Sequence, residues 1–319
     1  MSFSGMVKEE LAGKTGAARH CMLAELAAIM ESCGHLEQGE GRGPVLRVYS
    51  ENETNVRKCF TLLEKAFNID TAVLNRDAVR PKRGQVYLIE LDDPTLTEEI
   101  LGGTKLVEDR ENGGLKLMQN AVLTQRECCK RAYLRGAFLA SGSISDPNKG
   151  YHFEIVCQDG ERAGRLKSLI RSFHIDAKTV LRKKSHVVYV KEGAQIVDML
   201  ALMGAGIALM DLENVRILKE MRNSVNRKVN CETANINKTV LAAVRQMEDI
   251  RLIERTAGFQ SLSDELAEAA ALRLQYPDAT LKELGEMMDP PIGKSGINHR
   301  FRKLSAIADK LRGNEEELL

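Results

Sequence analysis

The chain has 319 residues and a formal net charge of +1, so its overall charge does not indicate a strongly acidic or basic partner. Its length allows two or three domains with ordinary hydrophobic cores. The N-terminus does not resemble a signal peptide, and no apolar run approaches the roughly 18 residues of a membrane span. These features predict a cytoplasmic protein with no membrane partner.

The seven cysteines are odd in number and include no C-x-x-C pair. They are Cys21, Cys33, Cys59, Cys128, Cys129, Cys157 and Cys231. Their spacing therefore indicates neither a disulfide framework nor a zinc knuckle. We expect no metal site and no other cofactor.

An internal repeat organises the first two thirds of the chain. Residues 21–36 (CMLAELAAIMESCGHL) align with residues 129–144 (CKRAYLRGAFLASGSI) at an offset of 108, and residues 65–76 align with 171–182 at an offset of 106. The identical pairs in the first alignment are Cys21/Cys129, Ala24/Ala132, Leu26/Leu134 and Gly34/Gly142. Because order and spacing both persist, the sequence predicts two copies of one structural unit.

Each copy is predicted to follow the order αββαββα. An apolar helix leads into two strands around a turn, a second helix, two more strands and a closing helix. The strand predictions rest on runs rich in β-branched and aromatic residues, namely VLRVYS, YHFEIV, VYLIEL and HVVYV. The fold class is therefore α+β. The Gly- and acid-rich stretch 102–114 between the copies is predicted to be an exposed loop or a short excursion.

Small residues mark one face of the first helix in each copy. Ala28 and Ser32 lie four residues apart, as do Gly136 and Ala140. Residues four apart share a helix face, so two such stripes would let two helix backbones approach closely. In a single helix this pattern is more often ordinary core packing, but here it occurs in both copies.

The two stretches LAAIMESCG (26–34) and LRGAFLASG (134–142) resemble the paired LAGLIDADG helices of homing endonucleases. That resemblance implies two αββαββα units packed through these helices, with sheets forming a saddle along the DNA major groove. In that family an acid at the penultimate motif position binds divalent ions for cleavage. This chain has Cys33 and Ser141 there, and neither is a suitable ligand for magnesium. We therefore expect no catalytic residues, although an endonuclease using displaced carboxylates such as Glu37 or Asp146 remains an alternative.

Basic residues occupy equivalent turns between the second pair of strands in the two copies. They are Arg80, Lys82 and Arg83 in the first and Arg182, Lys183 and Lys184 in the second. Such turns are often simply solvated, and contact with DNA phosphates is the functional alternative.

The segment after the repeat is predicted to be a helical, asparagine-rich linker. Asn223, Asn226 and Asn230 recur at helical spacing, and Arg227 and Lys228 add positive charge that could contact phosphate. The amide stripe could hydrogen-bond a partner, although a solvated surface is the simpler interpretation.

The last sixty residues predict a small helical domain. Its first helix covers 263–274, its second begins at Thr280 with a capping box completed by Glu283, and its third covers 294–311. Apolar residues recur every three or four positions on the third helix and predict its core face: Ile297, Phe301, Leu304, Ala308 and Leu311.

A short second helix followed by a basic third helix is typical of a helix-turn-helix DNA reader. The candidate DNA-binding residues are Thr280, Lys282, Lys294, Ser295, Asn298, His299, Arg300, Arg302 and Lys303. Arg and Asn can bind bases bidentately, whereas Lys and Ser can contact phosphates. A solvated helix face on a protein-docking domain is the alternative.

The degenerate tandem, the pattern N-x-x-N-R-x-x-N-C-E-x-A-N-x-x-K-T (223–239) and the string LKELGEMMDPPIGKSGINHRFRKL (281–304) together resemble the WhiA family of bacterial regulators. The resemblance covers nearly the whole chain. It implies a cytoplasmic, nucleoid-associated transcription regulator, not an enzyme, which binds double-stranded promoter DNA and serves sporulation or cell division and chromosome segregation. Its DNA-reading element would be residues 280–311, and another transcription or division protein could be a partner. The turn 289–293, with its two prolines, is longer than in a simple helix-turn-helix.

The predicted organisation is a tandem of αββαββα LAGLIDADG-like repeats followed by an all-α helix-turn-helix domain. The expected boundaries are 1–110 and 111–222 for the repeats, 223–259 for the linker, 260–313 for the helix-turn-helix domain and 314–319 for an acidic tail. A cell-division scaffold that acts mainly through protein contacts is a further alternative.

Overall fold

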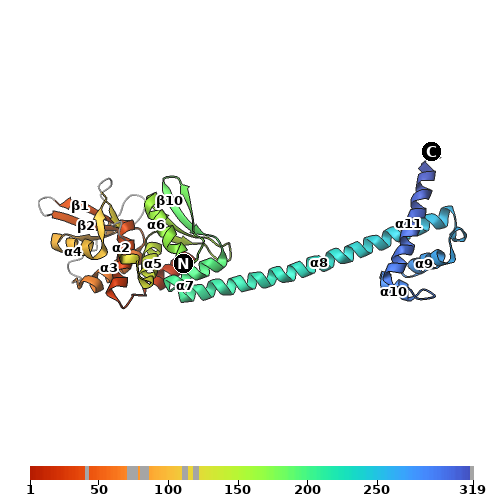
Figure 1. The fold of residues 1–319 in the computed structure, drawn as a ribbon, viewed down its shortest axis with the longest axis horizontal. Helices are drawn as coiled ribbons and strands as arrows, with labels where there is room; N and C mark the ends of the chain where they lie inside the picture. The colour runs from red at the N-terminus through yellow and green to blue at the C-terminus, as the bar shows by residue number, and fades with distance from the viewer. Residues whose placement is uncertain (40–42, 70–77, 80–85, 110–113, 118–121, 317–319) are drawn as a thin grey trace. The chain divides into compact units, whose positions relative to one another are not determined.

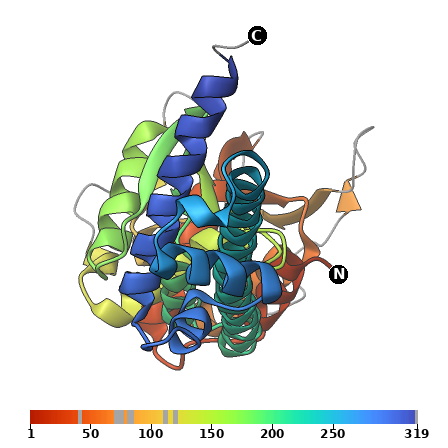
Figure 2. The ribbon, with the colours of Figure 1, turned by 90° about the vertical axis from the view of Figure 1, so that its right-hand side faces the viewer.

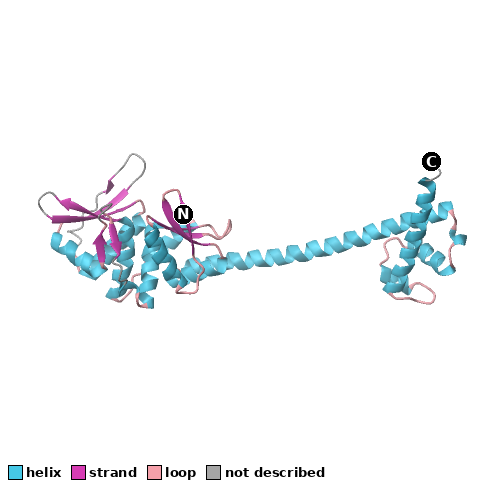
Figure 3. Ribbon diagram, turned by 45° about the horizontal axis from the view of Figure 1, so that its top comes forward, coloured by secondary structure: helices cyan, strands magenta, loops and turns pink. Residues whose placement is uncertain are grey.

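A computed structural model of the protein describes residues 1–39, 43–69, 78–79, 86–109, 114–117 and 122–316. The chain divides into two units, residues 1–219 and residues 220–319 (Figure 1). Every strand in the described ranges belongs to the first unit (Figure 3). Helix α8 (Gly206–Thr256) ends the first unit and begins the second. None of the described helices is long and apolar enough to cross a membrane.

Two antiparallel four-stranded sheets build the first unit, and they have the same strand order. The first runs β1-β2-β4-β3, with bounds Gly34–Gly39, Gly43–Ser50, Val86–Leu91 and Ala78–Val79. The second runs β7-β8-β10-β9, with bounds Gly142–Ile144, Phe153–Cys157, Ser185–Val190 and Lys178–Arg182. The shared order confirms the repeat predicted from the sequence.

Each sheet is accompanied by three helices at the predicted places. They are α2 (Arg19–Cys33), α3 (Glu53–Phe67) and α4 (Pro94–Thr104) in the first copy, and α5 (Glu127–Ser141), α6 (Gly160–Arg171) and α7 (Gly193–Met203) in the second. The αββαββα order and the α+β class are thus confirmed. The sequence reasoning missed helix α1 (Phe3–Ala12), which buries Val7 and Leu11 against the repeats.

Helices α2 and α5 pack against each other at the centre of the first unit (Figure 1). A Cβ atom on Gly136 of α5 would lie 2.3 Å from the carbonyl oxygen of Glu25 and 3.1 Å from the Cβ of Ala28. Real Cβ atoms do not approach a carbonyl oxygen so closely, so this crossing requires glycine. The small-residue stripes therefore do allow the close approach that the sequence predicted.

Buried charges link the two helices. The Glu25 carboxylate lies 2.8 Å from the Arg135 guanidinium of α5 and 3.2 Å from the Lys58 amine of α3, and the side chains of Glu25 and Lys58 are fully buried. Burial lowers the pKa of the Lys58 amine. The carboxylate therefore compensates the charges of two cations, one of them fully buried, whose burial without an opposite charge would be costly.

A second buried carboxylate, Glu31, joins the copies near the C-terminal end of α2. Tyr133 of α5 donates a hydrogen bond to it, and Arg165 of α6 pairs with its other oxygen. The Nε atom of Arg162 lies 3.7 Å away. The Glu31 carboxylate is thus surrounded by donors from the second copy.

The stretch between the copies forms a short hairpin with a buried side, so of the two predicted alternatives the short excursion agrees with the structure and the exposed loop was wrong for the described residues. Strands β5 (Leu106–Glu108) and β6 (Leu115–Leu117) pair antiparallel. Leu106, Leu115 and Leu117 are at most 5% exposed and belong to the main core. Leu106 within the Gly- and acid-rich stretch, with Leu115 and Leu117 directly after it, buries one face of the hairpin, because side chains alternate between the two faces of a strand.

The second unit is all-helical (Figure 2). The C-terminal turns of α8 pack with α9 (Asp264–Gln275), α10 (Leu281–Glu286) and α11 (Lys294–Glu316), and a 3₁₀ turn, Phe259–Ser261, precedes α9. Asp249 of α8 is buried and accepts hydrogen bonds from Ser305 at 2.6 Å and Arg312 at 2.5 Å. The three predicted helices are therefore completed by a fourth, the end of α8.

Candidate nucleic-acid interface

Helix α10 begins with the predicted capping box. The Thr280 hydroxyl accepts from the Glu283 backbone N–H at 3.3 Å, and the Thr280 backbone N–H donates to the Glu283 carboxylate at 2.7 Å. These hydrogen bonds hold the pKa of the Glu283 carboxyl below its usual value. The start of the helix is fixed by residues only three apart, which is why the sequence was sufficient to predict it.

The connection from α10 to α11 folds back onto α10. The Ile292 backbone N–H donates to the Gly285 carbonyl at 2.8 Å, and a Cβ atom on Gly285 would lie 2.4 Å from the Ile292 carbonyl oxygen. The two-proline turn therefore ends tightly against α10, and α11 begins directly after it at Lys294.

The predicted core face of α11 is confirmed. Ile297, Phe301, Leu304 and Ala308 are at most 2% exposed. The buried Arg273 of α9 places its guanidinium 5.3 Å from the centre of the Phe301 ring and donates to the carbonyl of Ala279 at 2.7 Å. Apolar contacts and this cation-π contact hold α11 against the rest of the C-terminal unit. The face of α11 that points away from this core is therefore accessible to solvent or to a ligand.

Most of the residues proposed to bind DNA lie on α11, whereas Thr280 and Lys282 lie at the start of α10. Seven of the nine are exposed: Thr280, Lys282, Lys294, Ser295, His299, Arg302 and Lys303. Asn298 and Arg300 are half-buried. The Arg300 guanidinium lies 3.4 Å from the Glu265 carboxylate, which partly neutralises it, so Arg300 is less suited to contact bases than Arg302.

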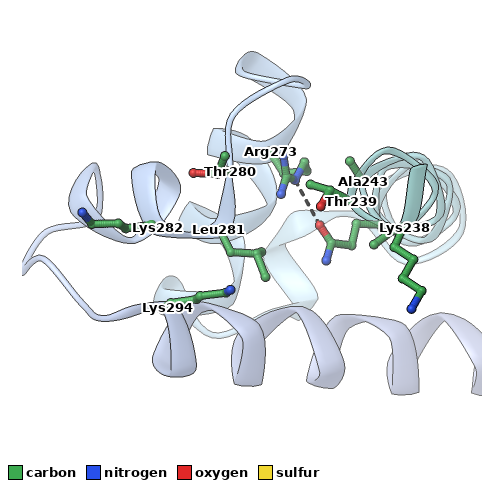
Figure 4. A pocket seen from close by; sticks show the side chains of 10 residues that line it. Lys238, Thr239, Ala243, Arg273, Thr280, Leu281, Lys282 and Lys294 are labelled. Atoms are coloured by element: carbon green, nitrogen blue, oxygen red, sulfur yellow. Dashed lines mark hydrogen bonds between the residues drawn. The ribbon is translucent and has the colours of Figure 1, made fainter. Parts of the chain in front are cut away.

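A basic pocket adjoins this face, with a volume of about 470 Å³ (Figure 4). Lys238 from α8, Lys282 from α10 and Lys294 from α11 all line it. Figure 4 shows the three amines pointing in different directions, with those of Lys282 and Lys238 on opposite sides of the pocket, so they could contact separate phosphates of the DNA backbone. The sequence reasoning missed Lys238, although it lies within the 223–239 pattern used to recognise the family.

The candidate residues of the linker lie on α8. Arg227 and Lys228 are exposed, and so are Asn223, Asn226 and Asn230. Their side chains are therefore accessible to a partner. They are also positioned as an ordinary solvated helix surface would be.

The sheets carry mixed charge in the described ranges. On the second sheet, Arg182 lies 3.4 Å from the Glu154 carboxylate, while Lys183 and Lys184 are exposed at the tip of the β9–β10 turn. On the first sheet, Arg47 pairs with both Glu37 and Glu90. Arg80, Lys82 and Arg83 lie outside the described residues. Because acids neutralise Arg47 and Arg182, these faces attract phosphates less than their arginines alone would suggest.

The two degenerate acid positions end the paired helices. Cys33 is the last residue of α2, where its sulfur accepts from the Asn55 side-chain amide at 3.7 Å, and Ser141 ends α5 and donates to the Ala137 carbonyl at 3.4 Å. Burial raises the pKa of the Cys33 thiol. A thiol kept protonated and a neutral hydroxyl are poor ligands for a hard divalent ion.

Cationic side chains lie beside the Cys33 position. The buried guanidinium of Arg162 donates to the carbonyls of Ala28 at 3.3 Å and Glu31 at 3.2 Å, near the end of α2. Burial lowers the pKa of the Lys8 amine, whose charge also acts on Cys33. Positive charge at this place opposes binding of a divalent cation.

The displaced carboxylates suggested by the sequence have local partners. Glu37 pairs with Arg47 and accepts from the Tyr49 hydroxyl at 3.2 Å. Asp146 accepts from the backbone N–H of Asn148 at 2.9 Å within the turn after β7. Both carboxylates therefore have hydrogen-bond or ion-pair partners from the protein itself.

Within the described ranges, one group of three or more metal-ligating side chains comes together, and it contains no carboxylate. It consists of His20, Cys21, Cys128 and Cys129. The sequence reasoning missed it because the cysteine spacing was judged along the chain. The signal was present in the repeat, because the offset of 108 makes residues 20 and 21 equivalent to 128 and 129.

Comparisons with known proteins match all three parts of the chain. Family models described as "WhiA N-terminal LAGLIDADG-like domain", "WhiA LAGLIDADG-like domain" and "WhiA C-terminal HTH domain" match residues 19–107, 130–222 and 225–308. A "Probable cell division protein WhiA" of Lachnoclostridium phytofermentans is 54% identical over 98% of this chain and 100% of its own length. A protein of the same description from Alkaliphilus metalliredigens is 48% identical, with 98% and 99% covered.

A solved structure has the same fold. The crystal structure of full-length DUF199/WhiA from Thermatoga maritima superposes with a TM-score of 0.60 at 22% identity, covering 97% of this chain and 99% of that chain.

Proposed function

The chain belongs to the WhiA family, and from that premise we propose that it is a transcription regulator that binds double-stranded promoter DNA and acts in cell division. The observation that carries the proposal is the exposed basic face of α11, the helix that follows the capped helix α10. Both helices lie in a domain that matches a helix-turn-helix family model. Arg302, with Asn298 one turn before it, would read base edges, while Lys294, Ser295 and Lys303 would contact phosphates.

Selection of bound fragments tests this function. The purified full chain is mixed with sheared DNA from its own genome at physiological salt, and retained fragments are sequenced. We expect a recurring motif upstream of genes, including genes for division proteins. Retention without a common motif would mean that the chain binds DNA only through charge, and the regulator proposal would then fail.

The proposal includes the absence of DNA cleavage. Cys33, Ser141 and the neighbouring Arg162 support it, because they replace the expected anionic ligands with neutral and positive groups. Incubated with supercoiled plasmid and magnesium or manganese, the full chain should nick no more DNA than a buffer control. Reproducible nicking that disappears in the Glu37→Gln or Asp146→Asn variant would instead favour the endonuclease.

The LAGLIDADG-like domain is proposed to assist by touching phosphates. Reversing Arg182, Lys183 and Lys184 together with Arg80, Lys82 and Arg83 should weaken DNA binding, because each lost phosphate contact reduces the number of released counterions. The plot of log affinity against log salt should become shallower by about 0.9 for each lost contact. Reversing Lys65 and Lys105, two exposed lysines outside these turns, is the control. An unchanged slope would mean that these turns of the sheets do not contact DNA.

A further inference from the structure

Four side chains with nitrogen or sulfur ligand atoms converge where the two paired helices begin. His20 and Cys21 lie in the first turn of α2, and Cys128 and Cys129 lie in the first turn of α5. Their four ligand atoms all lie within 4.8 Å of one another. The His20 Nδ1 atom is 3.1 Å from the Cys129 sulfur and 3.3 Å from the Cys21 sulfur.

The repeat explains why these residues meet. Residues 20 and 21 are equivalent to residues 128 and 129 at the offset of 108, so each copy contributes the second and third residues of its central helix. Because α2 and α5 pack together, equivalent residues on the two helices face each other. The cluster therefore results from the pairing of the two copies, and neither copy could form it alone.

The donor set has the chemistry of a structural zinc site. Three cysteine sulfurs and one imidazole nitrogen are a common tetrahedral set for Zn²⁺. With Zn–S bonds of about 2.3 Å, sulfur atoms at tetrahedral corners are roughly 3.8 Å apart. Ligand atoms that already lie within 4.8 Å need to move by only about 1 Å to reach that geometry.

In the metal-free chain, burial and the neighbouring cysteine thiols raise the pKa of Cys21 to about 12 and also raise the pKa of Cys129, so a zinc ion must displace thiol protons when it binds. Both pairs of ligands lie at helix N-termini, where the helix dipole stabilises negative charge, so a zinc site with three thiolates and a net charge of −1 would be stabilised there. Cys129 is buried and Cys128 is exposed, so the cluster is partly enclosed yet accessible to an entering ion. The cysteines of the described residues are free thiols.

We propose that His20, Cys21, Cys128 and Cys129 bind one zinc ion, which fastens the N-terminal ends of α2 and α5 and so joins the two LAGLIDADG-like copies. This site differs from the one used by homing endonucleases, whose acids lie at the C-terminal ends of these helices. Twelve residues separate Cys21 from Cys33, which is about 18 Å along a helix. The zinc here has a structural role that is independent of DNA reading.

The test begins with metal content. The full chain, purified without chelators and with reductant, should contain one zinc ion per chain by elemental mass spectrometry. Cys128→Ser and His20→Ala should each reduce this content strongly. Cys231→Ser is the matched control, because it removes an exposed cysteine of α8 outside the cluster and should leave the zinc in place.

A spectroscopic measurement distinguishes this site from nonspecific metal binding at the protein surface. Cobalt added to the metal-free chain should give the intense visible bands of a tetrahedral thiolate site, and Cys128→Ser should lose them while Cys231→Ser keeps them. Circular dichroism verifies that the variants are folded. A chelator should lower the melting temperature of the first unit in the wild type but not in folded Cys128→Ser.

Three outcomes would overturn the proposed site, and a fourth would overturn the identity of its metal. The first is a folded chain that takes up neither zinc nor cobalt at this site. The second is zinc retained by a Cys128→Ser/Cys129→Ser double variant. The third is a Cys21–Cys128 disulfide, found by peptide mapping in a chain that also fails to bind zinc when reduced, which would make the cluster a thiol pair that responds to oxidants. Iron in place of zinc would overturn the assignment of the metal.

Discussion

Replacing Asn298 and Arg302 together by alanine is expected to abolish sequence-specific DNA binding while leaving the C-terminal unit folded. The two residues lie four apart and so share one face of α11, whereas the core side of the helix is formed by Ile297, Phe301 and Leu304. Each bidentate contact to a base is worth about 1–3 kcal/mol, so the double variant should lose roughly a hundredfold or more in specific affinity.

Fluorescence anisotropy on a selected site and on a scrambled duplex measures this effect. The double variant should bind both duplexes alike. Lys303→Ala should instead weaken binding to both by similar factors, because a phosphate contact carries no sequence information. Lys310→Ala, an exposed lysine two turns further along α11, is the control. A double variant that still prefers the selected site by the wild-type factor would show that another surface reads the DNA.

Replacing Glu25 by alanine is expected to destabilise the first unit by roughly 3–5 kcal/mol, the usual cost of removing one partner from a buried ion pair. The change leaves the buried Lys58 amine and the Arg135 guanidinium without their shared carboxylate. It also removes side-chain volume where α2 crosses α5. We expect this variant to show the largest loss of stability among single charge removals in the unit.

Scanning calorimetry of the full chain measures this loss as a decrease in the midpoint temperature of the unfolding transition of the first unit. Glu127→Ala is the matched control, because it breaks an exposed pair with Arg131 on α5 and should cost less than about 1 kcal/mol. Glu25→Gln keeps the shape of the side chain but not its charge, so its loss of stability should lie between those of Glu25→Ala and Glu127→Ala. Equal stability of Glu25→Ala and Glu127→Ala would mean that the Glu25 contacts contribute nothing net.

The elements that were predicted correctly depend on contacts between near neighbours in the chain. Thr280 and Glu283 are three residues apart, and the apolar residues of α11 recur every three or four, so each pattern specifies its structure locally. The repeat was visible because two stretches had kept the same order of apolar and small residues. Gly136 could be singled out because its partner helix carries a matching stripe.

The features that were missed depend on contacts with residues that lie far away in the sequence. The stretch 102–114 is rich in glycine and acids, yet Leu106 within it and Leu115 just after it are buried, because the hairpin reaches the core that α2 helps to form. Glu25, Lys58 and Arg135 lie far apart in the sequence, and nothing near any one of them indicates its partners. The same holds for Lys238 of α8, which lines the basic pocket together with residues of α10 and α11.

The twofold repeat, the α+β class, the helix-turn-helix element and the missing acids at Cys33 and Ser141 can all be read from the amino-acid sequence, because each depends on residue types at short or regular spacing. Which distant side chains meet became visible only in the folded chain. Folding places Arg162 beside Cys33 and brings His20 and Cys21 to Cys128 and Cys129. The physical reason is that backbone hydrogen bonds and caps act over a few residues, whereas ion pairs and ligand clusters require two surfaces to pack, and the close crossing of α2 and α5 at Gly136 makes that packing possible.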